Sequence, residues 1–178
     1  MTAFRCRVSQ ARILSFALSI GVLAAGGALV AHDGDTEVAG TLVGVWESVA
    51  PLGLDCQTRE PFGPLIRTVY TLHQGGTMSE QNTDPIEGPY RTSGVGIWKP
   101  TSDRTYTATY GHYGFDPVSR ELNAIVKART RIRLSRDGKS FTENGTFEVF
   151  DAAGNPLLDP SGAPIAGCFA ATAHRLTF

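Results

Sequence analysis

The stretch at residues 121–135 reads ELNAIVKARTRIRLS and carries the clearest structural pattern in the sequence. Its even positions are mostly apolar, and its odd positions from Lys127 to Arg133 are all basic. Alternation with a period of two is typical of a β-strand that has one face in a core and the other in water. The side chains from Leu122 to Leu134 at even positions are therefore expected to point inward, and the basic row is expected to be a solvated face.

Residues 140–151 follow after the turn 136–139 and predict the second strand of a hairpin. The register that pairs Ser135 with Ser140 puts the apolar side chains of both strands on the same face. The inward pairs it predicts are Leu134 with Phe141, Ile132 with Glu143, Thr130 with Gly145 and Ala128 with Phe147.

No segment after residue 31 shows a sustained helical period, and short alternating segments bounded by turn residues recur instead. The further strands are predicted at 42–49, 65–74, 77–82, 92–99, 104–115 and 166–178. The loops are predicted at 50–64, 83–90 and 152–164, with a β-bulge at Gly111 and a possible short strand at 157–158. About eight sequential strands predict an all-β fold, either an antiparallel up-and-down β-barrel or a two-sheet sandwich. The long strands favour the barrel, because closure removes exposed edges.

The N-terminus has the layout of a signal peptide. A basic segment at residues 1–12 precedes an uncharged apolar run at 13–31, which includes small residues. The alternative is a retained membrane anchor, which the length of the run just allows. We predict a signal peptide at 1–31, a flexible segment at 32–41 and a barrel domain at 42–178, in a secreted or periplasmic protein without stable membrane insertion after cleavage.

The numbers of basic and acidic residues indicate which kinds of partner the protein is not expected to bind. The chain has 178 residues, 16 basic and 17 acidic, and residues 1–31 contain three of the basic and none of the acidic ones. The remainder is therefore mildly acidic, which argues against a nucleic-acid partner. No motif for a cofactor or metal is present, and the oligomeric state is left open.

Three cysteines are present, and Cys6 would leave with the signal peptide. The remaining Cys56 and Cys168 are expected to form one disulfide in an oxidising compartment. A metal-binding or catalytic thiol pair is the alternative, but no Cys-x-x-Cys spacing supports it.

The segment Gly44-Val45-Trp46 resembles the Gly-x-Trp signature that opens lipocalins and other calycin barrels. The resemblance implies that Trp46 plugs a closed end of the barrel, with Arg175 from the last strand over its indole ring. The chain from residue 42 onward also looks like a group of small secreted bacterial barrels, mostly described as hypothetical proteins. The segments that carry this likeness are 71–73, 76–78, 94–98 and 167–168.

The expected interior leaves room for a ligand, because several inward residues are small. We predict a pocket that Tyr70, Tyr106, Tyr110, Ala128 and Phe147 line, with Glu143 as a polar group near one mouth. The alternative is a core filled by its own side chains.

Two carboxylates have the potential for chemistry, since Glu143 is expected inside and Glu80 shares a face with Met78. A buried carboxyl group tends to have a raised pKa, which suits a general acid or base. Tyr106 and Tyr110 could donate hydrogen bonds to a substrate. The alternative is that both carboxylates lie in water near a barrel mouth.

Three functions fit these expectations. The first is a secreted barrel that binds a small hydrophobic molecule in its lumen. The second is a cofactor-free cyclase or isomerase on the same barrel, and the third is a surface or interaction protein with a filled core. The fold alone does not separate them.

Overall fold

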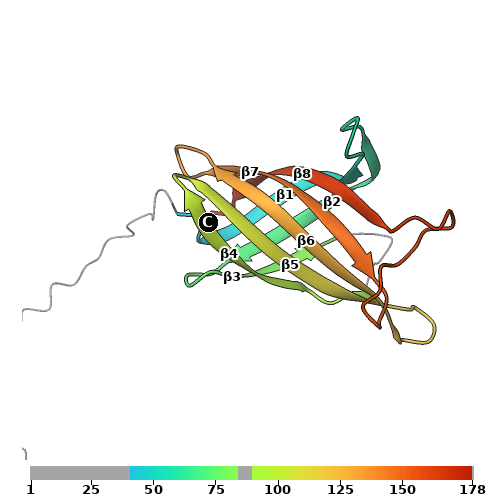
Figure 1. Cartoon of the computed structure of the whole chain (residues 1–178). Coiled ribbons are helices and arrows are strands. Elements are labelled where there is room, and N and C mark those ends of the chain that lie inside the picture. Colours follow the sequence, from blue (N-terminus) through green and yellow to red (C-terminus); the bar gives the residue numbers. More distant parts are fainter. Residues whose placement is uncertain (1–40, 84–89, 178) are drawn as a thin grey trace, which may run out of the picture. The chain divides into compact units, whose positions relative to one another are not determined.

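The barrel closes through its first and last strands. The computed structural model describes residues 41–83 and 90–177. Each strand pairs antiparallel with the next, and β8 returns to β1 (Figure 1). The strands are β1 (Gly44–Leu54), β2 (Pro61–Leu72), β3 (Thr77–Asn82), β4 (Gly94–Ser102), β5 (Thr105–Phe115), β6 (Leu122–Leu134), β7 (Ser140–Phe150) and β8 (Ala166–Arg175). The predicted up-and-down barrel is confirmed, and the two-sheet sandwich is wrong.

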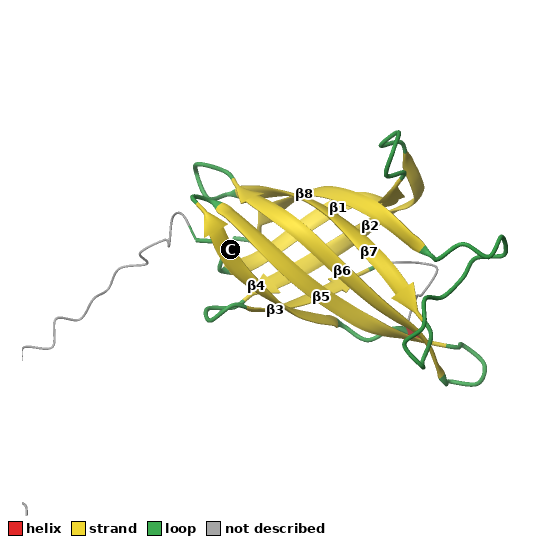
Figure 2. Ribbon diagram, viewed as in Figure 1, coloured by secondary structure: helices red, strands yellow, loops and turns green. Residues whose placement is uncertain are grey.

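Strands and connecting loops make up the described chain (Figure 2). Over residues 41–83 and 90–177, no helix has both the length and the apolar character needed to cross a membrane. The predicted signal peptide, nearly all of the flexible segment and most of the loop at 83–90 lie outside the described residues.

The hairpin of β6 and β7 has the predicted register. Leu134 pairs with Phe141, Ile132 with Glu143, Thr130 with Gly145 and Ala128 with Phe147. Even positions of β6 from Ala128 to Leu134 are buried, and the basic side chains between them are exposed. The alternating pattern of residues 121–135 therefore fixes which side chains enter the barrel.

The predicted loop at 50–64 is too long and is confined to residues 55–60, because β1 continues to Leu54 and β2 begins at Pro61. A register shift between Pro51 and Gly53 absorbs the irregularity. Proline lacks a backbone donor but is tolerated at the first position of a strand and at bulges. Pro51 therefore lies within β1, and Pro61 and Pro64 lie within β2, without interrupting either strand.

The predicted bulge at Gly111 is also wrong. β5 and β6 pair without a break from Thr105 to Gly114, and the register shifts only between Gly114 and Phe115. Tyr113 is half exposed on the outside, and His112 occupies the inward position. The aromatic side chain that follows Gly111 thus lies on the outer face, although the pairing of the backbone with β6 continues unchanged to Gly114.

One half of the barrel is filled with side chains. The fully buried residues in this half include Leu42, Trp46, Leu72, Leu134 and Phe141, each at most 1 % exposed. The rings of Trp46 and Phe141 pack edge to face, with centroids 5.0 Å apart. β1, β3, β5 and β7 start at this end, so the turns that precede β3, β5 and β7 lie over the filled core.

The opposite end of the barrel carries the longer loops. Four turns in these loops, two of them in the connection between β7 and β8, each open with an aspartate whose carboxylate accepts backbone hydrogen bonds from the residues that follow. The four are Asp55, Asp116, Asp151 and Asp159. These hydrogen bonds lower the pKa of each carboxyl group, for Asp159 after the larger effect of the Ser161 hydroxyl donor, and fix the turns that surround this end.

Candidate functional site

The filled end is sealed by Trp46 and Arg175. The Arg175 guanidinium carbon lies 4.1 Å from the centroid of the indole ring, as the likeness to calycin barrels implied. Its nitrogens donate to the carbonyl oxygens of Thr41, Val43 and Gly138 at 2.7 to 3.0 Å. The indole Nε1 of Trp46 donates to the carbonyl oxygen of Leu42 at 3.0 Å. These bonds tie the segment before β1 across the end of the barrel.

Gly44 is required at this seal for two reasons. Its φ of 145° lies in a region that L side chains rarely adopt. A Cβ there would also lie 2.4 Å from Nη1 of Arg175. Any side chain at position 44 would therefore displace the guanidinium from the indole ring.

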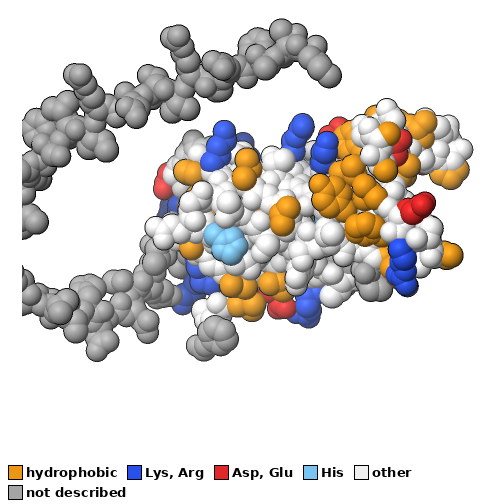
Figure 3. All heavy atoms as spheres, turned by 90° about the horizontal axis from the view of Figure 1, so that it is seen from below, with side chains coloured by type: hydrophobic (Ala, Val, Ile, Leu, Met, Phe, Trp, Pro, Cys, Tyr) orange, Lys and Arg blue, Asp and Glu red, His pale blue; other side chains and the backbone are white. Residues whose placement is uncertain are grey.

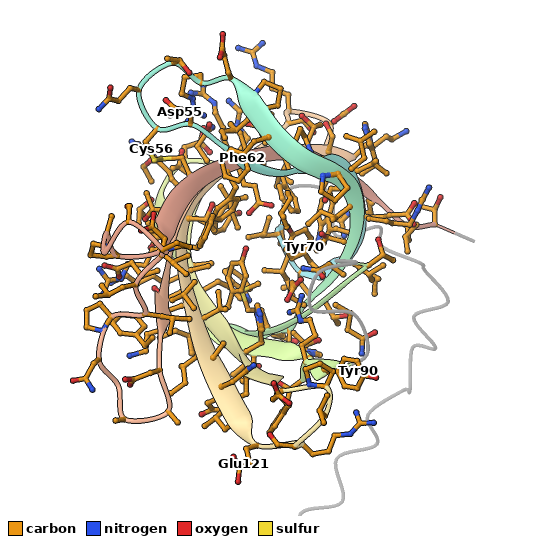
Figure 4. All side chains as sticks on the ribbon, turned by 90° about the vertical axis from the view of Figure 1, so that its right-hand side faces the viewer. Asp55, Cys56, Phe62, Tyr70, Tyr90 and Glu121 are labelled. Carbon is orange, nitrogen blue, oxygen red and sulfur yellow. A yellow bond between two sulfur atoms is a disulfide. The ribbon has the colours of Figure 1, made fainter. Side chains whose placement is uncertain are left out.

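The other half of the barrel is hollow and contains a cavity of about 350 Å³. Figure 4 looks into this end, where Tyr70 projects into the lumen beyond the loops that carry Asp55 and Glu121. The wall toward the mouth is largely apolar and comes from several strands and the loop before β8. Its main apolar members are Leu52, Phe62, Ile66, Val126, Phe147, Val149, Ile165 and Phe169.

The inner end of the cavity is polar, and Glu143 is its centre. Glu143 is 1 % exposed, and its Oε1 accepts a 2.5 Å hydrogen bond from the Tyr70 hydroxyl. Its Oε2 lies 3.3 Å from the Thr130 hydroxyl. Burial raises the pKa of Glu143 to about 7, while the two hydroxyl donors oppose the shift. The carboxyl group therefore exchanges its proton near neutral pH.

Two tyrosines lie beside this carboxyl group. Burial raises the pKa of Tyr70 well above its ordinary value, and the neighbouring Glu143 raises it further. Burial and then the carboxylates of Glu143 and Glu80 raise the pKa of Tyr110 in the same way. Both phenols therefore stay protonated at neutral pH, and the one hydroxyl proton of Tyr70 is already donated to Glu143.

A second carboxylate at the inner end is already paired. Nη2 of Arg91 lies 2.7 Å from Oε2 of Glu80, and both side chains are at most 5 % exposed. Gly94 faces this pair, and a Cβ there would lie 2.5 Å from Oε2 of Glu80. The glycine thus leaves space for a buried ion pair inside the barrel.

The structure brings most of the predicted site residues together. Tyr70, Glu80, Tyr110, Ala128, Glu143 and Phe147 all line the cavity. Tyr106 does not, because it lies in the filled half with its ring 5.6 Å from that of Trp98. The predicted position of Glu143 near one mouth is wrong, because Glu143 is buried at the inner end of the cavity.

Sequence reasoning missed Arg91 and much of the apolar wall. Arg91 forms only an isolated bridge with Gly114, so no alternating pattern surrounds it. Leu52 and Phe62 lay in a segment predicted to be a loop. The apolar residues between the prolines of residues 50–64 were the signal that could have placed them on strands.

The predicted disulfide is present. Cys56 and Cys168 are bonded, with their Cα atoms 5.2 Å apart. The bond joins the hairpin of β1 and β2 to the start of β8, beside the mouth. It therefore holds together parts of the rim that are 112 residues apart in the sequence.

Exposed apolar side chains surround the mouth. Phe62, Leu65, Val118 and Leu158 are between 45 % and 89 % exposed, and each belongs to a segment at this end. On the outer face seen in Figure 3, apolar atoms gather toward this end, and the Lys and Arg side chains lie apart from one another. The apolar lining of the cavity therefore continues onto the rim.

Comparison of the chain with protein-family models and with curated proteins found no match. The likeness to a lipocalin-like barrel therefore rests on the eight-stranded closed topology and on the contact of Trp46 with Arg175.

Proposed function

We propose that this barrel binds a small, largely apolar molecule in its lumen. The observation that carries the proposal is that one half of the barrel is packed and the other half is hollow. A cavity of about 350 Å³ lies within the range of ligand sites, roughly 300–1,000 Å³. Its apolar wall and small number of buried polar groups are also typical of such sites. The cavity argues against an interaction protein with a filled core.

The disulfide supports a role outside the cytoplasm, because disulfides form and persist in oxidising compartments. The predicted signal peptide at 1–31 supports the same location. Secretion or a periplasmic location is thus part of the proposal, and a soluble carrier or scavenger of small molecules is the function that fits it.

The proposal is tested by filling the cavity. N-phenyl-1-naphthylamine is a neutral apolar dye that fluoresces on entering an apolar site. The substitution Ala128→Trp should abolish its binding, because Ala128 lines the cavity and is 5 % exposed. Asn123→Trp on the same strand is the matched control, because Asn123 is exposed. Dye binding that survives Ala128→Trp in a folded protein would exclude the lumen as the site.

An enzyme on the same barrel is the second candidate, and the buried pair Glu143–Tyr70 favours it. Glu143 could take a proton from a substrate carbon and return it to another carbon, while a tyrosine hydroxyl donates to the oxygen of the intermediate enolate. This isomerisation needs no cofactor, because it changes neither the oxidation state nor the composition of the substrate.

The two functions are distinguished with a molecule that co-purifies with the protein and is identified by mass spectrometry. This molecule is incubated with the wild-type protein and with Glu143→Gln. A carrier returns that molecule unchanged. An acid–base enzyme converts it, and the variant binds it but loses a factor of about 10²–10⁴ in rate.

A further inference from the structure

Among the described residues that line the inner end of the cavity, carboxyl groups outnumber guanidinium groups. The described residues there include two carboxyl groups, Glu80 and Glu143, and one guanidinium, that of Arg91. Arg91 lies 2.7 Å from Glu80, so these two charges compensate each other. The carboxyl group of Glu143 is left as the excess acidic group.

The polar groups that line the cavity with Glu143 include Tyr70 from β2, Glu80 from β3, Tyr110 and His112 from β5, and Arg91, which precedes β4. Thr130 from β6 also contacts Glu143. On β8 its cross-strand neighbour is Ala171, and on β6 it is Ile132. The hydrogen bonds that Glu143 accepts come from the hydroxyl groups of Tyr70 and Thr130. Hydroxyl donors stabilise a carboxylate but carry no charge to compensate it.

The charge at the polar end of a ligand would decide how it interacts with Glu143. An anionic ligand would place a second negative charge beside Glu143 in a buried site, where the repulsion is little screened. A protonated amine would instead form an ion pair with Glu143 and relieve the cost of burying its charge. The apolar wall between this end and the mouth would cover the rest of the molecule.

We infer that the lumen selects an amine with an apolar body, its ammonium group against Glu143 and its body toward the mouth. The inference rests on the proposed function and names the ligand class of the same site. It also assigns Glu143 as the residue that determines specificity.

Three ligands with the same eight-carbon body test this inference: octylamine, 1-octanol and octanoate. Each competes with N-phenyl-1-naphthylamine for the wild-type protein at pH 8. Octylamine should bind about tenfold or more tightly than 1-octanol, the low end of the coupling measured for close charge pairs in desolvated sites. Octanoate should bind more weakly than both. Octanoate binding as tightly as octylamine would overturn the inference.

Glu143→Gln should remove the preference for octylamine over 1-octanol, with the affinity for each ligand measured directly on the folded variant. Glu148→Gln is the matched control, because it is the same substitution at an exposed position of the same strand. It should keep the preference. A preference that persists in Glu143→Gln would overturn the assignment of Glu143, although the lumen would remain the binding site.

The pH profile of the wild-type protein tests the inference without any variant. The affinity for octylamine should rise as pH increases through about 7, where Glu143 loses its proton, whereas the affinity for 1-octanol should stay nearly constant. Parallel profiles for the two ligands would overturn the inference. If the dye itself does not bind to the wild-type protein, the proposed function and the inference both fail, which separates that result from the failure of amine selection alone.

Discussion

The Tyr70 hydroxyl donates a 2.5 Å hydrogen bond to Oε1 of Glu143 across the barrel interior, although the residues are 73 positions apart in the chain. The bond joins β2 to β7, which are not neighbours in the sheet. A polar contact thus links opposite walls at the boundary between the packed half and the hollow half.

Replacing Tyr70 by phenylalanine removes this donor and should raise the pKa of Glu143 further, because the hydrogen bond lowers that pKa. At pH 8 the variant should lose about 1–3 kcal/mol of unfolding free energy, as expected when a buried charged acceptor loses its partner. At pH 5 the carboxyl group is protonated and the loss should be smaller. Urea unfolding at the two pH values measures this, with Tyr113→Phe at a half-exposed position as the control. Equal losses at both pH values would contradict the role of the bond.

Glu143 should make the folded state less stable as pH rises from about 4.5 to about 7. Its pKa is about 7 in the folded protein and 4.5 ordinarily, so within this window the folded state binds more protons than the unfolded state. The unfolding free energy must then fall with pH, by on the order of 3 kcal/mol in total. Urea midpoints of the wild type and Glu143→Gln, compared from pH 4 to 8, should diverge over this window in favour of the variant. A constant difference across the range would show that Glu143 titrates normally.

Trp46→Ala should cost about 3–5 kcal/mol of unfolding free energy, the usual range for truncating a large core aromatic. Trp46 is fully buried and contacts both Phe141 and Arg175. Trp98→Ala provides the comparison, because Trp98 is only partly buried and should cost less. Thermal or urea unfolding measures both, and a smaller loss at Trp46 than at Trp98 would be inconsistent with the seal.

Removing the disulfide with Cys56→Ser and Cys168→Ser should lower the unfolding free energy by about 2–5 kcal/mol, the range seen for native disulfides in small secreted domains. Peptide mapping of the unreduced wild-type protein should recover the two cysteines in one linked fragment. Recovery of both as free thiols from protein purified under oxidising conditions would refute the bond.

Alternation in the sequence determined which side chains face inward, and for β6 and β7 it also determined the register. It could not determine how far along the barrel axis a residue lies. Tyr106 and Tyr110 share the inward face of β5, yet only Tyr110 reaches the cavity. Depth depends on strand tilt and on the position of the plug, which are properties of the closed barrel rather than of one strand.

The remaining differences have local causes. Prolines at strand ends and bulges made residues 50–64 look like a loop, so part of the apolar wall was missed. Arg91 lies outside any regular strand, and its pairing with Glu80 depends on long-range packing. The disulfide was accessible to sequence reasoning, because export would leave only two cysteines to pair.

The seal that Trp46 and Arg175 form has a kinetic consequence for any molecule that occupies the lumen. Under the proposed function, this end is closed over the described residues, so a bound molecule would enter and leave at the opposite end, and a new molecule could not arrive until the previous one had gone. Exchange is then limited by dissociation and does not accelerate when more competitor is added. Under the proposed function, exchange of this kind would suit a protein that retains its ligand and releases it slowly.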